Sequence, residues 1–203
     1  FYWVGKETLR PQSVPAELNY DMWLGPAPYK PYNEHRVHQT FRGYWDYDGG
    51  GLTDMGQHYM DPVQYLLGKD RTSPVKVEVD APEQHPDAVG IWRKILYTYD
   101  DACQIVLEGE GFESKDDTPY IEGPLGKVYK GFRCTIPDIM QKLAELPDPE
   151  PQNTDFLECV RTRRRFALDE EIGHRSCTLV NMGACALRLN RTLHFNPVSQ
   201  LFV

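Results

Sequence analysis

GGGLTDMGQHYMD, residues 49–61, is the most informative stretch of this chain. Three glycines followed by Thr53 and Asp54 predict a tight turn directly before a helix, because glycine adopts conformations closed to other residues and Thr or Asp caps helix starts. Asp54 and His58 are four residues apart, so they lie on one face of that helix. A carboxylate one turn from an imidazole can orient a general base near neutral pH. The stretch therefore predicts an Asp54–His58 site at the mouth of a turn that a ligand can approach.

The same spacing also has a purely structural explanation. An Asp at a helix start is commonly only a cap, and a His one turn later is commonly a surface residue or a hydrogen-bonded core residue. Asp/His pairs at this distance arise often by chance, so the spacing alone does not assign the site. Further along, we favour a cap at Asp61 and a helix restart at Pro62 over one kinked helix. The stripe predicted to be buried is Met55, Tyr59, Val63 and Leu66.

The longer order around the pair resembles a known family. Residues 42–61 read RGYWDYDGGGLTDMGQHYMD and are followed by YLLGKD at 65–70. This order is similar to the substrate domain of the Gfo/Idh/MocA oxidoreductases, which are NAD(P)-dependent enzymes acting on sugars and polyols. Three further elements resemble the bacterial branch of that family: WLGPAP at 23–28, HRS at 174–176 and RTLHFNP at 191–197. The resemblance covers nearly the whole chain.

The resemblance implies oxidation of a secondary alcohol with NAD or NADP as cofactor. His58 matches the family's catalytic His, the base that takes the hydroxyl proton. Asp54 matches the paired Asp, which binds a substrate hydroxyl and favours the protonated imidazole. The family's Glu-Lys-Pro motif and the G-x-G-x-x-G of its Rossmann domain do not occur here. We therefore expect a C-terminal fragment whose own Rossmann domain lies outside this sequence, and assign no cofactor-binding residues.

Composition narrows the possible partners. The net charge of −8 argues against nucleic acid, whose phosphates such a chain would repel. No apolar run approaches the ~20 residues that a membrane span needs. The five cysteines are scattered and odd in number, which suits reduced thiols better than a disulfide framework. We expect a cytoplasmic protein, with export as the alternative.

We expect one α+β domain over residues 1–203, a mostly antiparallel, open-faced sheet with helices packed on one side. Residues 1–40 are rich in proline and aromatic residues, which favours an extended segment. Period-two alternation and two successive hairpins predict one antiparallel sheet over 75–130. Residues 137–191 are predicted to form the helical part. The open sheet face predicts a homodimer or higher oligomer.

Substrate contacts are expected from the segment that precedes the pair. The predicted carbohydrate-binding residues are Tyr29, Asn33, Arg36, His38, Arg42 and Trp45. The aromatic residues of this segment suit either stacking on sugar rings or a lid over the core, and the sequence leaves both open. His35, His38 and His58 with Asp54 form a conceivable metal set, but H-x-x-H in a loop is a weak signal and we assign no metal. Two alternative functions remain: a lyase-type, hydratase-type or metal-dependent sugar enzyme on the same scaffold, and a non-catalytic dimerisation or glycan-binding module.

Overall fold

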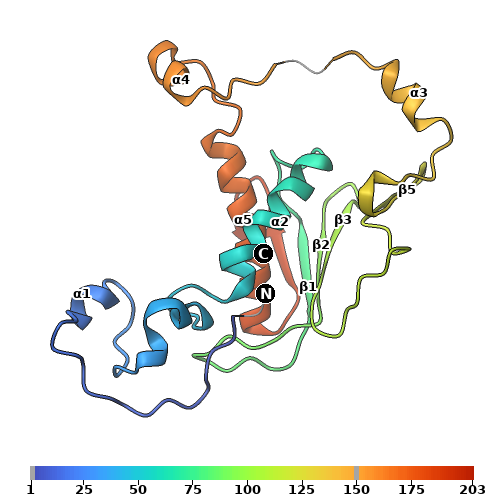
Figure 1. The fold of residues 1–203 in the computed structure, drawn as a ribbon. Coiled ribbons are helices and arrows are strands. Elements are labelled where there is room, and N and C mark those ends of the chain that lie inside the picture. The colour runs from blue at the N-terminus through green and yellow to red at the C-terminus, as the bar shows by residue number, and fades with distance from the viewer. Residues whose placement is uncertain (1–2, 149–150) are drawn as a thin grey trace. The chain divides into compact units, whose positions relative to one another are not determined.

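The computed structural model describes residues 3–148 and 151–203 (Figure 1). The chain forms two compact units, Phe1–Gly111 with Asp169–Val203, and Phe112–Leu168. Among the described residues, no helix is both long enough and apolar enough to cross a membrane.

A five-stranded antiparallel sheet forms the base of the first unit (Figure 1). Its order is β3-β2-β1-β6-β7, and the strands are β1 (Lys76–Asp80), β2 (Lys94–Thr98), β3 (Gln104–Glu108), β6 (Leu193–Asn196) and β7 (Leu201–Phe202). Val77 pairs with Tyr97, and Tyr97 pairs with Ile105. Because alternate residues of a strand point to the same face, these three paired side chains lie on one face of the sheet, and all three are buried. The hairpin of β2 and β3 was predicted from this alternation and is confirmed.

Two helices, α2 (Gly51–Leu66) and α5 (Glu170–Leu189), cover the buried face of this sheet (Figure 1). The core between them contains Leu52 and Met60 from α2 and Leu179 from α5. Gly183 permits the close approach of α5, since a Cβ there would lie 2.1 Å from the Tyr97 hydroxyl oxygen. The α+β class with helices on an antiparallel sheet is confirmed.

The prediction of one sheet over residues 75–130 is wrong. Strands β4 (Ile121–Gly123) and β5 (Gly126–Val128) form a separate two-stranded sheet and belong to the second unit. They are three residues long and bury no side chain, so they have no apolar face to join to the main sheet. The main sheet is completed instead by β6 and β7 from the C-terminal end of the chain. Leu193 and Phe195, at alternate positions of β6, are buried in the core.

The second unit contains the β4–β5 hairpin, the short helix η3 (Lys130–Phe132), α3 (Ile139–Ala144) and α4 (Phe156–Thr162). Helix α4 is capped by Asp155, whose carboxylate accepts the Glu158 N–H at 2.9 Å. The predicted helical part, 137–191, therefore consists of three separate helices, and its residues 149–150 lie outside the described residues.

The N-terminal segment is less extended than predicted. It contains α1 (Tyr20–Leu24), η1 (Glu34–Arg36) and the start of η2 (His38–Gly43). Tyr20 and Tyr32 are buried in a small cluster of their own, while Tyr29 is 76% exposed. Some aromatic residues of the segment are therefore buried and others are exposed, and stacking on sugar rings stays a prediction.

Helix α2 differs from its prediction in three ways. It begins at Gly51 rather than at the Thr53–Asp54 signal, and it continues through Pro62, so the predicted restart is wrong. Proline is tolerated because its missing N–H leaves only the carbonyl of residue 58 unbonded, on an exposed side of the helix. The predicted stripe is also wrong in part: Tyr59 and Leu66 are more than half exposed. The buried stripe is Leu52, Gly56, Met60 and Gln64.

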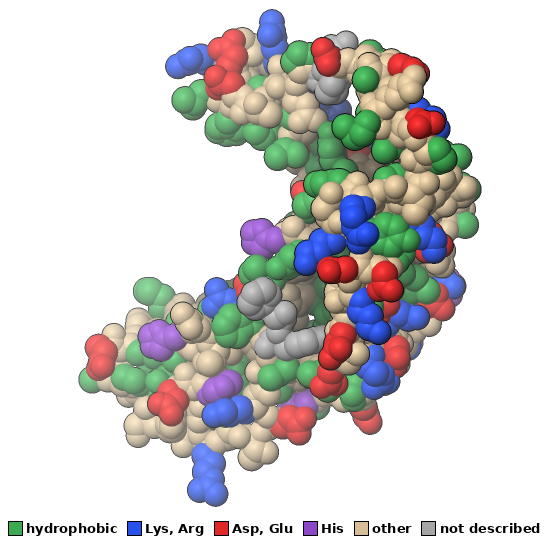
Figure 2. Space-filling view, turned by 45° about the vertical axis from the view of Figure 1, so that its right-hand side comes forward, with side chains coloured by type: hydrophobic (Ala, Val, Ile, Leu, Met, Phe, Trp, Pro, Cys, Tyr) green, Lys and Arg blue, Asp and Glu red, His purple; other side chains and the backbone are tan. Residues whose placement is uncertain are grey.

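The surface carries charges of both signs. Figure 2 shows Lys and Arg side chains interspersed with Asp and Glu on the face that it presents, rather than gathered into one basic tract. Several form ion pairs across or along the strands, such as Lys76 with Glu78 at 2.8 Å. Charges of opposite sign on this face therefore lie near enough to pair.

Candidate active site

Asp54 is held in place by an ion pair with Arg42. The Arg42 Nε lies 3.1 Å from Asp54 Oδ1, and the two side chains are 29% and 21% exposed. The Arg42 guanidinium also lies over the rings of Trp3 and Phe41, at 5.4 and 5.0 Å from their centroids. Asp54 stands in the first turn of α2, where the helix dipole favours a negative charge. The carboxylate is therefore oriented from two sides.

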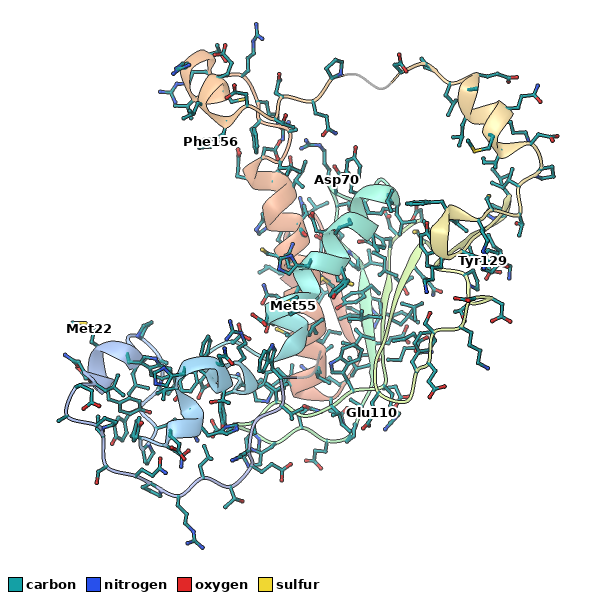
Figure 3. The ribbon with its side chains drawn as sticks, viewed as in Figure 1. Met22, Met55, Asp70, Glu110, Tyr129 and Phe156 are labelled. Atoms are coloured by element: carbon teal, nitrogen blue, oxygen red, sulfur yellow. The ribbon has the colours of Figure 1, made fainter. Side chains whose placement is uncertain are left out.

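His58 follows one turn later on the same helix and is exposed. Met55, labelled in Figure 3, marks the part of α2 that carries the pair. Within residues 3–148 and 151–203, the His58 ring makes no hydrogen bond or ion pair, so both ring nitrogens are open to a ligand. Neither Asp54 nor His58 is buried in the apolar core. The geometry offers a free imidazole beside a fixed carboxylate, which is a workable base site.

Asp48 is a second carboxyl at this site, and the sequence pattern did not predict it. Its Oδ2 is buried and has no hydrogen-bond partner among the described residues. Burial, followed by the negative charge of Asp54, raises the pKa of Asp48 to about 6, although the positive charge of Arg42 opposes this. Arg42 thus acts electrostatically on two carboxyl groups. Acidic residues on both sides of a glycine run, preceded by an arginine, were the available sequence signal.

Asp48→Asn is expected to stabilise the fold at about pH 8 and to change it little at about pH 4. Because the folded-state pKa of Asp48 lies above its ordinary value of 3.8, its protonated form stabilises the fold at low pH, and this contribution is lost as the pH rises through about 6. The two pKa values allow at most about 3 kcal/mol at neutral pH, which solvent screening reduces to about 1–2 kcal/mol. The amide cannot ionise and avoids this cost.

Urea unfolding of both proteins at the two pH values measures the difference. Glu83→Gln, a charge removal at an exposed position, is the matched control and should shift neither curve. An equal gain or loss for Asp48→Asn at both pH values would contradict the assignment, because it would not depend on ionisation.

The glycine turn has a packing role. Gly49 and Gly50 have φ values of 91° and 87°, a conformation that other residues rarely adopt. A Cβ on Gly50 would lie 2.6 Å from Val89 Cγ1. The Gly50 N–H donates a hydrogen bond to the Arg42 carbonyl at 2.8 Å. The expectation that a ligand approaches this turn is therefore wrong, since both residues are buried. The turn instead brings Arg42 of η2 next to Asp54 of α2.

The other predicted substrate residues are placed differently. Tyr29 is largely exposed, and His38 is exposed with a φ of 55°. Asn33 caps η1, accepting the His35 N–H at 2.8 Å and donating to the Arg10 carbonyl at 2.9 Å. Trp45 donates its indole N–H to the His85 carbonyl at 3.1 Å and packs against the main core. Of the six, only Arg42 contacts Asp54.

Arg36 is committed to a buried ion pair. Its guanidinium makes two hydrogen bonds to the Asp87 carboxylate and lies 4.8 Å from the centroid of the Tyr44 ring. Burial alone would raise the pKa of Asp87, but hydrogen bonding and charge from Arg36 outweigh it and hold that pKa below its ordinary value. Lys30 adds a second cation at 3.5 Å from Asp87. This arrangement stabilises the fold rather than presenting Arg36 to a ligand.

The conceivable metal set does not come together. The His35 Nδ1 is hydrogen bonded to the Tyr44 hydroxyl at 2.8 Å. In the part of the chain that the structure describes, no three His, Cys, Asp or Glu side chains are placed to hold a metal ion. The residues that remain as candidates for the site are Asp54, His58, Arg42 and Asp48.

Comparison with known proteins agrees with this fold. The family model for the oxidoreductase family, C-terminal alpha/beta domain, of the Gfo/Idh/MocA type matches residues 1–203. No curated protein matches the chain significantly. The match extends over both units and includes the helix with Asp54 and His58. The chain belongs to the C-terminal domain family of the Gfo/Idh/MocA oxidoreductases.

Proposed function

We propose that this chain is the substrate-binding and catalytic half of an NAD(P)-dependent oxidoreductase that acts on a hydroxyl of a sugar, polyol or glycoside. The observation that carries the proposal is the free, exposed imidazole of His58 one turn from the Arg42-held carboxylate of Asp54. Membership of an oxidoreductase family supports the reaction class. The free cysteines fit a reducing compartment such as the cytoplasm.

In this proposal, His58 takes the proton of the substrate hydroxyl at a ring nitrogen, as a general base. The Asp54 carboxylate accepts a hydrogen bond from a substrate hydroxyl, and its charge favours the imidazolium that forms. Arg42 keeps that carboxylate in one orientation. The nicotinamide, when bound, accepts the hydride from the same carbon.

The residues of this chain fit the substrate side of the reaction rather than the cofactor side. The N–H groups of Gly49 and Gly50 are bonded to the backbone carbonyls of Tyr44 and Arg42, so they are not free to hold phosphate. Gly109 and Gly111 follow β3 and lead into a loop rather than a helix. The cofactor is therefore assigned to the chain's own N-terminal domain, which membership of a C-terminal domain family implies.

The test uses the protein together with its N-terminal domain. It is incubated with NAD⁺ or NADP⁺ and with a panel of sugars, polyols and methyl glycosides, and reduced nicotinamide is measured by its absorbance. Reduction with at least one compound supports the proposal, and the C-terminal chain alone serves as the inactive control. Consumption of a compound without net nicotinamide reduction would instead indicate the lyase or hydratase alternative.

A homodimer through the sheet is part of the proposal. The face of the sheet away from α2 and α5 carries a cross-strand row of Glu78, Leu96 and Val106, with Val106 48% exposed. A partly apolar row on an open antiparallel sheet suits a two-fold contact. Sedimentation at micromolar concentration should give a dimer, and Val106→Asp should convert it to a monomer. Val198→Asp, at a 91% exposed position outside the strands, is the control. A monomeric unsubstituted chain would contradict the prediction.

A further inference from the structure

The first unit contains a hollow of about 530 Å³ beside the N-terminal aromatic cluster. One side is the WLGPAP turn, residues 23–28, and the other side is Phe41 with Asp46 and Tyr47. The α1 helix, labelled in Figure 1 and marked by Met22 in Figure 3, leads directly into that turn. The lining is mostly aromatic and proline side chains, with Asp46 as its one charged group.

The aromatic wall of the hollow is fixed before any ligand arrives. The Trp23 ring is stacked on Tyr20 at 5.8 Å and meets the edge of Tyr47 at 5.0 Å between centroids. Asn19 caps α1 through a 3.0 Å bond from the Met22 N–H, and Gly25 ends it with a φ of 53°. A rigid wall lowers the ordering cost of binding, because few rotamers are lost.

Asp46 supplies the polar edge. One carboxylate oxygen lies 3.7 Å from Lys30 Nζ, and the other lies 3.6 Å from an Arg188 guanidinium nitrogen. Both distances are too long for a hydrogen bond. Both oxygens therefore keep their capacity to accept hydrogen bonds, while the two cations balance the charge. The side chain is 16% exposed and lines the hollow, so a ligand hydroxyl in the hollow can reach it.

A sugar ring matches this combination. It presents an apolar C–H face that packs on aromatic and proline side chains, and hydroxyl groups at its rim that donate to a carboxylate. An anionic ligand would place a second negative charge beside the Asp46 carboxylate, whose own charge Lys30 and Arg188 already balance. A lipid chain would leave the Asp46 carboxylate without a donor. The chemistry of the lining thus favours a neutral carbohydrate.

The hollow is connected to the candidate active site through Phe41. This ring lines the hollow, and it also lies 5.0 Å from the guanidinium of Arg42, which holds Asp54. We propose that the hollow binds a second, non-reacting sugar residue, so that the substrate is a glycoside or oligosaccharide rather than a free monosaccharide. This inference rests on the proposed function for its substrate class, but the binding itself does not require the cofactor.

Binding is tested on the chain without cofactor by saturation-transfer NMR, with cellotriose, maltotriose and chitotriose as probes. At least one trisaccharide should show transfer to its ring protons. Ala27→Arg, which fills the hollow from the turn, and Asp46→Asn should each weaken that binding by about tenfold or more, the equivalent of one good contact. Glu83→Gln and His194→Ala are changes at exposed positions outside the lining and should leave binding within about twofold, a difference too small for a lost contact.

A thermal melt of each variant shows whether a loss of binding is caused by unfolding. All four positions are at least partly exposed, so each variant should keep its fold. Equal binding in Ala27→Arg and the unsubstituted chain, or no transfer to any trisaccharide, would overturn the inference. In the assay with the cofactor domain, Ala27→Arg should raise KM for a trisaccharide and not for a monosaccharide. Failure of nicotinamide reduction would refute the proposed function and leave the NMR result standing, so the two failures are distinguishable.

Discussion

His58→Ala is expected to lower kcat by about 10²–10⁴-fold, the contribution of a positioned general base, in the protein with its cofactor domain. Substrate binding should weaken far less, because proton transfer stabilises the transition state rather than the ground state. The His58 side chain is exposed and supports no packing, so the melting temperature should stay nearly constant. Steady-state kinetics and a thermal melt measure the two effects separately.

Two further variants sharpen this result. Asp54→Asn should cause a milder, mixed loss in kcat and KM, because the amide keeps a hydrogen bond but loses the charge that supports the imidazolium. His194→Ala removes another exposed imidazole, from β6, and should leave turnover unchanged. Near-normal turnover in His58→Ala, or a collapsed melting temperature in both active-site variants, would show that the pair is scaffolding.

The sequence predicted those parts of the structure that depend on local pattern. The existence of helix α2 follows from the glycine run and the Thr53–Asp54 signal, and the β2–β3 hairpin follows from period-two alternation around Asp100-Asp101. Both signals lie within about twenty residues of chain. The edges of these elements were less well predicted, because a glycine cap at Gly50 and a tolerated Pro62 outweighed the usual start and stop signals.

Long-range contacts could not be predicted in the same way. Strand β6 joins β1 across more than a hundred residues, and nothing local distinguishes it from the second-unit hairpin as a sheet partner. The contacts of the candidate site could not be predicted from local sequence pattern either. Arg42 and Asp48 gain their roles only when the glycine turn folds them against Asp54, and burial then changes the chemistry of Asp48.

Arg36→Met is expected to destabilise the fold by about 3–5 kcal/mol, the usual cost of removing one partner from a buried ion pair. The Arg36 and Asp87 side chains are 9% and 15% exposed, so the carboxylate would be left largely desolvated, with only Lys30 nearby. This outcome separates two interpretations of Arg36. The sequence suggested a substrate contact, whose loss would raise KM at constant stability, whereas the geometry indicates a structural pair, whose loss lowers stability first.

Two comparisons make the Arg36 result decisive. Arg36→Met with Asp87→Leu should recover part of the lost stability, because the double variant leaves no buried charge unpaired. Arg93→Met breaks an ion pair with Asp80 in which both side chains are about half exposed, and it should change the stability far less, because solvent screens an exposed pair. Urea unfolding of the four proteins gives the free energies directly. If Arg36→Met cost no more than Arg93→Met, the buried pair would not stabilise the fold, and a raised KM would then return Arg36 to the substrate site.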